Sequence, residues 1–202
     1  MYIAPNVTND EYKKLNLDDS NSSDWARAID IFKSRISVRY LEPVDLLIKD
    51  DEKRSPLERR YGFTILAIDC LLIETLQSFR EGLIDIKGKS KKIFIKFLTE
   101  RQNFKDFFTE ELANMFYKDI RCGILHQAET MGDILVWSVG EVIGKRSDGT
   151  LYVNRTILHE LIKKEIELYC NELKNKENAE LRKNFRRKMD FIARKEQGIT
   201  IG

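Results

Sequence analysis

A helical repeat of apolar side chains between residues 57 and 79 limits most what this chain of 202 residues can fold into. Apolar residues recur there every three or four positions, as along an α-helix: Leu57, Tyr61, Ile65, Ile68, Leu72, Leu76 and Phe79. The segment Ser55–Glu58 has the sequence of a capping box with proline in the first turn, and Gly82 is a typical helix end. The middle of this helix is apolar nearly all the way round, which predicts a place deep in a helical bundle.

Shorter helices are predicted on both sides of this long one. Ser22 or Ser23 is expected to cap the first, Pro43 to interrupt it, and Thr109 to cap a helix that runs to about Gln127. The expected helices cover about residues 24–36, 44–48, 91–100, 110–127, 156–174 and 178–195.

The periodicity changes between about residues 133 and 154. The runs Asp133–Val139 and Leu151–Asn154 are β-prone, and Asp148-Gly149 between them is typical of a hairpin turn. The predicted fold class is therefore mainly α, a helical bundle with a small inserted β-hairpin. We expect a polar lead-in over 1–22, a helical domain over 23–174, and a basic amphipathic C-terminal helix over 175–202.

Composition excludes several classes of protein. With 42% hydrophobic and 34% charged residues the chain is neither disordered nor fibrous, and its net charge of +2 does not by itself mark a nucleic-acid binder. Three isolated cysteines and two histidines favour neither disulfides nor a metal site, so no metal or cofactor is expected. No signal peptide is expected, because the N-terminal residues lack a basic stretch followed by an apolar one. The most apolar run, Gly62–Leu76, contains two acids and is too short for a bilayer. A cytoplasmic protein without membrane contact is expected.

The residues best suited to chemistry are Arg121 and His126, an R-x4-H pair near the end of the helix that Thr109 caps. Cleaving RNA without a metal needs a group that titrates near neutrality, which histidine supplies. It also needs a fixed cation beside the phosphoryl oxygens, which arginine supplies. By spacing alone, a solvated arginine and a hydrogen-bonded core histidine is the favoured interpretation of the pair, because such a spacing occurs by chance in many helical proteins.

This motif resembles the signature R-x(4–6)-H of HEPN domains (higher eukaryotes and prokaryotes nucleotide-binding). The stretches RYGFTILAIDCLLIETLQSF (Arg60–Phe79) and FYKDIRCGILHQAET (Phe116–Thr130) also resemble uncharacterised bacterial proteins of this type. The resemblance covers about residues 24–174, and only the motif is diagnostic. It implies a metal-independent endoribonuclease with Arg121 and His126 as catalytic pair, of the kind found in toxin–antitoxin, CRISPR-linked and antiphage systems.

One position departs from the family pattern. Active members commonly carry Asn, Asp or His after the arginine, and here that residue is Cys122. The alternative is therefore a catalytically inactive HEPN-like module that binds RNA or a partner protein, such as an antitoxin or another subunit of a defence system. A structural helical protein with neither activity nor RNA affinity is a third possibility.

Helix geometry separates the two side chains of the motif. Five residues at about 100° each place His126 about 140° around the helix from Arg121. Two copies related by a two-fold axis would bring two arginines and two histidines into one cleft. In-line attack by the 2′-hydroxyl also needs a base and an acid on opposite sides of the phosphorus, which two copies of His126 can supply. We therefore expect a homodimer, and the family resemblance implies the same.

Three further residues are candidates for supporting roles: Asp69, Glu74 and Cys122. Asp69 or Glu74 could orient the arginine or the histidine of the motif from the neighbouring helix. The alternative is that these acids form a structural salt bridge or a solvent-facing stripe. Cys122 lies one helical turn from His126, but a packing role fits it better than nucleophilic catalysis. The other histidine, His159, borders an apolar face and is expected to be structural.

The C-terminal stretch 175–202 carries eight basic and four acidic residues, a balance of +4. Its basic side chains either steer RNA through phosphate contacts or solvate the outer face of a docked helix. The RNA-binding candidates are Arg182, Lys183, Arg186 and Arg187.

Overall fold

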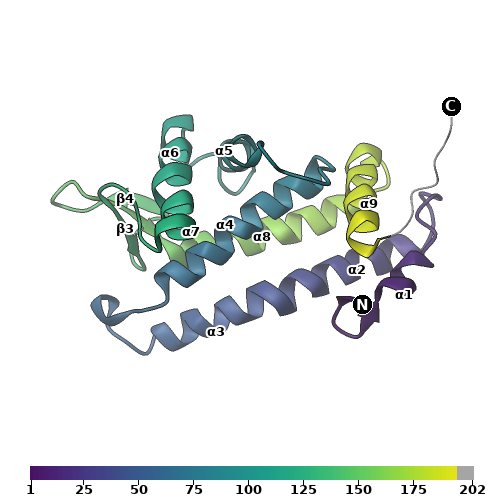
Figure 1. Cartoon of the computed structure of the whole chain (residues 1–202), viewed down its shortest axis with the longest axis horizontal. Helices are drawn as coiled ribbons and strands as arrows, with labels where there is room; N and C mark the ends of the chain where they lie inside the picture. The colour runs from purple at the N-terminus through teal and green to yellow at the C-terminus, as the bar shows by residue number, and fades with distance from the viewer. Residues whose placement is uncertain (195–202) are drawn as a thin grey trace. The chain divides into compact units, whose positions relative to one another are not determined.

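The structure, a computed structural model, describes residues 1–194 and is mainly α, as predicted (Figure 1). Most elements are helical, including the π-helical segments η1 and η3 and the 3-10 turn η2, and the short strands fall in two groups, one at the start of the chain and one before the last two helices. The elements are β1 (Tyr2–Ala4), β2 (Val7–Thr8), α1 (Asn9–Lys13), α2 (Asp24–Ile36), η1 (Ser37–Leu41), α3 (Glu42–Asp51), η2 (Pro56–Glu58), α4 (Gly62–Arg80), α5 (Ser90–Glu100), α6 (Glu110–Met115), η3 (Phe116–Cys122), α7 (Gly123–Gln127), β3 (Ile134–Trp137), β4 (Ile143–Lys145), β5 (Leu151–Asn154), α8 (Arg155–Lys174) and α9 (Ala179–Ala193).

The chain forms two compact units rather than the three consecutive segments expected from the sequence. Among the described residues, the first unit comprises residues 1–39, 78–86 and 166–194, and the second comprises residues 40–77 and 87–165. Each unit is therefore assembled from stretches that are distant in the sequence, which local composition and periodicity do not reveal.

The first unit has an aromatic core. Phe32 of α2 lies at its centre, with ring centroids 4.8 to 5.7 Å from its three nearest aromatic neighbours. The rings of this cluster belong to Trp25, Phe32, Phe79, Tyr169 and Phe185. All five are buried, so the cluster joins α2, α8 and α9 with the last turn of α4.

The first 22 residues are folded and contribute to this unit. β1 and β2 pair antiparallel, and Thr8 caps α1 with a complete capping box. Ile3 and Tyr12 are fully buried, and the Tyr12 hydroxyl donates to Asp190 of α9 over 3.1 Å. The expected polar lead-in is thus a structured part of the unit, because a few apolar residues suffice to anchor it.

Helix α9 is amphipathic, as predicted, and its apolar side packs into the first unit. Phe185 and Met189 are fully buried in the first unit. The helix ends at Ala193, with Arg194 in the left-handed conformation. Lys195 and the rest of the expected basic stretch, up to Gly202, lie outside the described residues.

Contrary to the prediction, Pro43 does not interrupt the run of helical residues. Helical residues continue from α2 through η1 into α3, where Pro43 stands in the first turn. Proline lacks an N–H and its ring clashes with the carbonyl four residues earlier. The wider π turn of η1 precedes Pro43 and accommodates this defect without ending the helix.

The long helix α4 begins later than the sequence predicted. The capping box of Ser55 and Glu58 is present, with the Ser55 hydroxyl donating to the Glu58 carboxylate over 2.7 Å. It opens only the 3-10 turn η2, and α4 starts at Gly62. At the other end, Gly82 follows α4 with a positive φ of 62°, as its role in ending the helix requires.

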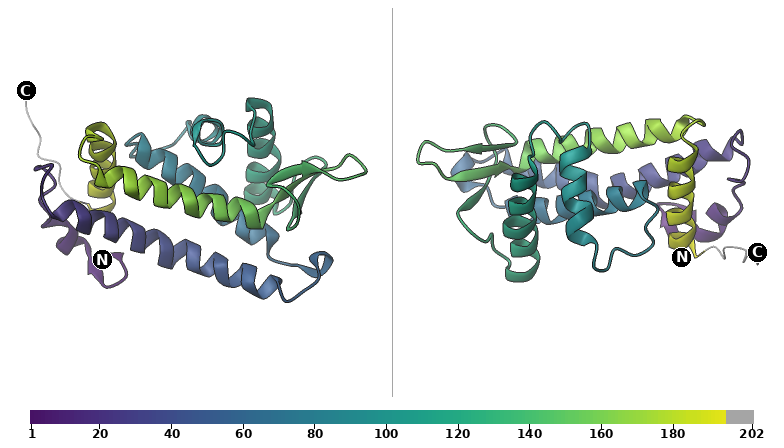
Figure 2. Two further views of the ribbon diagram at one scale, coloured as in Figure 1. Left: turned by 180° about the vertical axis from the view of Figure 1, so that it is seen from behind. Right: turned by 90° about the horizontal axis from the view of Figure 1, so that it is seen from above.

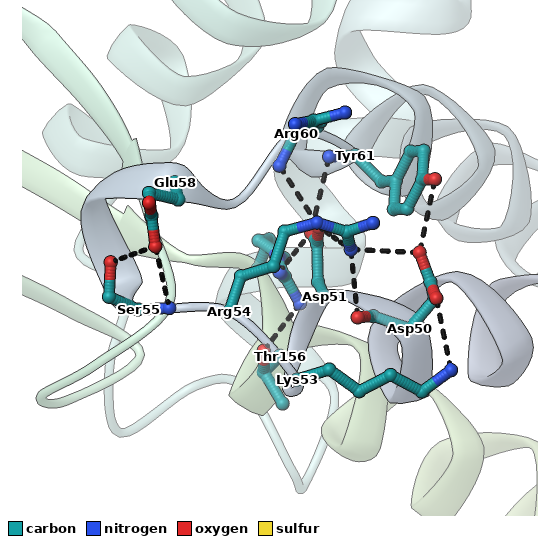
Figure 3. Close-up of polar contacts among 10 residues, drawn as sticks. Asp50, Asp51, Lys53, Arg54, Ser55, Glu58, Arg60, Tyr61 and Thr156 are labelled. Carbon is teal, nitrogen blue, oxygen red and sulfur yellow. Dashed lines mark hydrogen bonds and ion pairs between the residues drawn. The ribbon is translucent and has the colours of Figure 1, made fainter.

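Asp51, at the end of α3, explains the late start. Figure 3 shows its fully buried carboxylate accepting the backbone N–H groups of Arg60 and Tyr61, over 3.0 and 3.1 Å. Arg155, also buried, donates to the same carboxylate over 2.6 Å. Asp51 thereby satisfies N–H groups just before Gly62, a task that a local capping residue otherwise performs.

The inserted β structure is a three-stranded sheet rather than a simple hairpin. The strand order is β3–β5–β4, with β4 antiparallel and β3 parallel to β5 (Figure 1, Figure 2). The predicted turn at Asp148-Gly149 is confirmed, but it joins β4 to β5 instead of β3 to β5. The run Ile143–Lys145, with a central glycine, had too weak a β pattern to be recognised as a strand.

Candidate active site

The R-x4-H motif lies where a π-helical segment passes into an α-helical turn. Thr109 caps α6 as predicted, its hydroxyl accepting the N–H of Leu112 over 3.2 Å. The helical chain then continues through η3, which carries Arg121, into α7, which carries His126. π-helical turns are rare and occur often at functional sites.

Arg121 is held by Glu74 of α4. Its Nε donates to Oε1 of Glu74 over 2.8 Å, and its Nη2 lies 3.4 Å from Oε2, so the contact is bidentate. The two side chains are only 16% and 9% exposed. Of the two acids considered from the sequence, Glu74 is therefore the one that orients the arginine.

Two residues not recognised from the sequence complete this arrangement. The Ser90 hydroxyl donates to Oε1 of Glu74 over 2.6 Å and accepts from the Tyr117 hydroxyl over 3.3 Å. The guanidinium carbon of Arg121 lies 5.3 Å from the centre of the Tyr117 ring, a cation–π contact. Tyr117 precedes Arg121 by four residues, a helical spacing that could have indicated it.

The electrostatics of this cluster favour a permanently charged arginine. Burial opposes the charged form, but the hydrogen bond and the negative charge of Glu74 outweigh it and raise the pKa of Arg121. The arginine is thus a fixed cation whose plane is set by a carboxylate and an aromatic ring.

His126, by contrast, is exposed. It makes no hydrogen bond or ion pair with any residue in the range 1–194, and none joins it to Arg121. The arginine turns inward to Glu74 while the histidine meets solvent, which agrees with the separation expected from helix geometry.

Gly123 lets the chain fold back beside the motif. Ala128 ends α7 in the left-handed conformation, and the N–H of Met131 donates to the carbonyl of Asp119 over 2.7 Å. A Cβ on Gly123 would lie 2.5 Å from the carbonyl oxygen of Glu129. Only glycine leaves room for this return, which fixes the end of α7 next to His126.

Asp69 does not belong to the site. It is fully buried and pairs with Nδ1 of His159 over 2.7 Å. Burial raises the pKa of Asp69, opposed by the hydrogen bond and charge of His159. His159 is fully buried as well, so its expected structural role is confirmed.

Cys122 follows Arg121 directly and is half-buried. The other two cysteines, Cys70 and Cys170, are buried, and burial raises the pKa of Cys170 to about 12. All three are free thiols.

The four basic candidates on α9 differ in accessibility. Arg182 is buried, with its guanidinium carbon 3.8 Å from the centre of the Trp25 ring, and Arg186 is paired with Asp18 over 2.6 Å. Lys183 and Arg187 are exposed. Two of the four thus have structural contacts within the first unit, and two face solvent.

Neither a metal centre nor a clear membrane segment marks the described chain. Among residues 1–194 no group of three or more His, Cys, Asp or Glu side chains is placed to hold a metal ion. One described helix, α4, is long and apolar enough to cross a membrane by length and composition, but 61% of that window is buried inside the protein. Such a helix also fits the core of a water-soluble protein.

In comparisons with known proteins, no protein-family model, no curated protein and no solved structure matches the chain.

Proposed function

We propose that this protein is a metal-independent endoribonuclease of HEPN type, with Arg121 and His126 as its catalytic pair. The observation that carries the proposal is the contrast between the two residues. Arg121 is rigidly oriented by Glu74, while His126, five residues later, is exposed and free of hydrogen bonds within the described chain. A fixed cation beside an accessible imidazole is what cleavage of RNA without a metal requires.

Arg121 keeps donors for a phosphate although it is paired with Glu74. A guanidinium has five N–H groups. Glu74 engages Nε and Nη2 and leaves Nη1, which forms no ion pair with a described residue. In the proposed site Nη1 donates to a non-bridging phosphoryl oxygen, and Glu74 and Tyr117 keep the guanidinium from swinging away.

The reaction we propose is attack by the RNA 2′-hydroxyl on the adjacent phosphorus. One His126 removes the 2′-hydroxyl proton, the bond to the 5′-oxygen breaks, and a second His126 protonates that oxygen. The products are a 2′,3′-cyclic phosphate end and a 5′-hydroxyl end. Since one histidine cannot stand on both sides of the phosphorus, the site we propose is formed by two copies of the chain about a two-fold axis.

Cleavage of a single-stranded or loop RNA in the presence of EDTA tests the proposal. We expect the wild type to cleave, and His126→Ala and Arg121→Ala to lose at least about 100-fold in rate. Gln127→Ala, at an exposed neighbouring position of α7, is the matched control and should cleave normally. Undiminished cleavage by both active-site variants would exclude this pair as the catalytic centre.

Mixing wild-type protein with the His126→Ala variant tests the composite site. A heterodimer of the two has a single His126 and therefore lacks either the base or the acid of the proposed reaction. If the site is formed by two copies, equal amounts of both proteins should, after exchange of protomers, leave about one quarter of the activity, because only wild-type homodimers cleave. If each chain cleaves RNA by itself, about half of the activity remains.

A second candidate function is a catalytically inactive HEPN-like module that binds RNA or a partner protein. It is favoured by Cys122, which replaces the usual polar residue, and by the bidentate ion pair that neutralises Arg121. RNA binding without turnover at any enzyme concentration would support this alternative.

The proposed setting is bacterial toxin–antitoxin or antiphage defence in the cytoplasm, with an antitoxin or another defence-system protein as partner. It rests on the motif alone. Co-purification of the protein expressed with its neighbouring genes tests it, since a neutralising partner should bind in a fixed ratio and suppress RNA cleavage.

A further inference from the structure

A hollow of about 320 Å³ opens in the first unit at the start of α2. Serine and asparagine side chains, one tryptophan and three basic residues line it. The lining residues are Ser20, Asn21, Ser22, Ser23, Trp25, Ala26, Ile29, Lys174, Lys176 and Arg182. No acidic residue is among them.

Arg182 is the central cation of this hollow and is only 5% exposed. One face of its guanidinium covers the Trp25 ring, and Nη1 donates to the carbonyl oxygen of Ser20 over 2.9 Å. Its buried Nε has no hydrogen-bond partner, and Arg182 forms no ion pair with residues 1–194. Burial, without any opposing carboxylate, lowers the pKa of Arg182. A buried charge without a counter-ion is costly, so such a residue usually has an anionic partner.

Two exposed lysines add positive charge at the rim. Nζ of Lys176 donates to the side-chain oxygen of Asn21, and Nζ of Lys174 to that of Asn171, each over 3.3 Å. Neither lysine pairs with a carboxylate of the described chain. The hollow therefore brings together three cations whose contacts are all with neutral groups.

The acidic residues near the hollow are already engaged elsewhere. Asp24 accepts the N–H of Asn16 over 2.7 Å, and Asp19 accepts the N–H of Asn21 over 2.8 Å. Asp18 forms its ion pair with Arg186. None of these carboxylates pairs with Arg182, Lys174 or Lys176, so the three cations of the hollow have no carboxylate partner among residues 1–194.

We propose that this hollow is a binding site for a phosphoryl group, supplied either by free phosphate or by the terminal phosphate of an oligonucleotide. Arg182 donates from Nη2, the lysines neutralise the second charge, and the hydroxyl of Ser23, which caps no backbone N–H, completes the contacts. The first turn of α2, a helix of 13 residues, adds the positive end of its dipole. The site lies in the first unit and does not depend on Arg121 or His126 in the second.

Titration calorimetry with inorganic phosphate on the full chain tests the site. We expect saturable binding with one phosphate per chain. The protein has two tryptophans, Trp25 and Trp137. In Trp137→Phe protein, the fluorescence of Trp25 should change on the same binding curve, because the ligand contacts the arginine stacked on its ring.

Charge-removing variants separate a built site from general attraction to a basic surface. Lys174→Gln with Lys176→Gln, both at exposed positions, should weaken phosphate binding about tenfold or more. Lys183→Gln with Arg187→Gln removes the same charge from exposed positions of α9 and should change binding less than about twofold. Absence of saturable binding, or equal weakening by the two double variants, would overturn the proposal.

An oligonucleotide without 2′-hydroxyls distinguishes the two sources of the phosphoryl group. A 2′-O-methyl oligonucleotide is compared with and without a 5′-phosphate. Tighter binding of the phosphorylated form, lost in Lys174→Gln with Lys176→Gln, identifies a nucleic-acid end as the ligand. Equal binding of both forms, with phosphate still bound by the wild type, identifies free phosphate.

Discussion

Replacing Glu74 by glutamine tests the ion pair that orients Arg121. The substitution keeps the size and one carbonyl oxygen of the side chain but removes its charge. Breaking a buried pair costs about 3–5 kcal/mol, and losing a hydrogen bond to a charged group about 1.5–3 kcal/mol. Both side chains are mostly buried, and the glutamine can still accept from Arg121 or Ser90, so we expect Glu74→Gln to lower the free energy of unfolding by about 2 kcal/mol.

A double-mutant cycle gives the coupling between the two residues. Arg121→Met leaves the Glu74 carboxylate buried with only the Ser90 hydroxyl, and we expect it to cost about 3 kcal/mol. The double variant should lose about 3 rather than about 5 kcal/mol, because the second substitution removes a partner that is already unpaired.

Urea unfolding followed by circular dichroism and by tryptophan fluorescence measures these differences. Coincident transitions by both probes are the check that a single free energy of unfolding applies. If the two single effects add within about 0.5 kcal/mol in the double variant, Glu74 and Arg121 do not interact, and the arginine is not held as we describe.

Three further predictions concern other parts of the chain. Gly82→Ala should lower the free energy of unfolding in urea by about 1–3 kcal/mol, because φ is 62° and the new Cβ would lie 2.5 Å from Oδ1 of Asn184. Gly88→Ala is the control and should lower it less, because Gly88 has a φ of 72° but no neighbour within 4 Å. Iodoacetamide at neutral pH should label Cys122 well before Cys70 and Cys170, since burial raises the pKa of both buried thiols. Mass spectrometry of the labelled peptides measures the labelling rates, and equal rates for the three cysteines would contradict the prediction. Hydrogen bonds from Arg54 and Lys53 lower the pKa of Asp50 to about 2. The stability that the Asp50 carboxylate contributes is therefore present above about pH 4 and is lost as the pH falls through 2. The difference in free energy of unfolding between wild type and Asp50→Asn should shrink over that range, and a constant difference would contradict the prediction.

The sequence predicted the helices well and their long-range partners poorly. The caps at Thr109 and Ser55 and the stop at Gly82 are local features, and all three are present. The start of α4 at Gly62 depends instead on Asp51, a residue eleven positions earlier whose carboxylate no local pattern assigns to that helix. Similarly, the turn at Asp148-Gly149 was readable, whereas the parallel pairing of β3 with β5 is a tertiary choice.

The candidate site shows the same division. Arg121 and His126 were found from their spacing, and Glu74 as a possible partner on the long helix. The choice between Glu74 and Asp69 was left open by the sequence, because both carboxylates lie in the same apolar run. The structure distinguishes them by their partners, since Asp69 faces His159 and Glu74 faces Arg121. Ser90 enters from a separate helix and had no sequence signal.

The π-helical segment η3 makes the length of residues 116–122 as important as their identity. Removing one residue there, such as the exposed Lys118, would let a wide turn become an ordinary α-helical one, while the helix after it keeps its orientation. Arg121 would then follow Tyr117 by three residues instead of four. The same deletion in a purely α-helical stretch would rotate everything after it by about 100°. The contact between the guanidinium and the Tyr117 ring therefore depends on the π-helical winding of this segment.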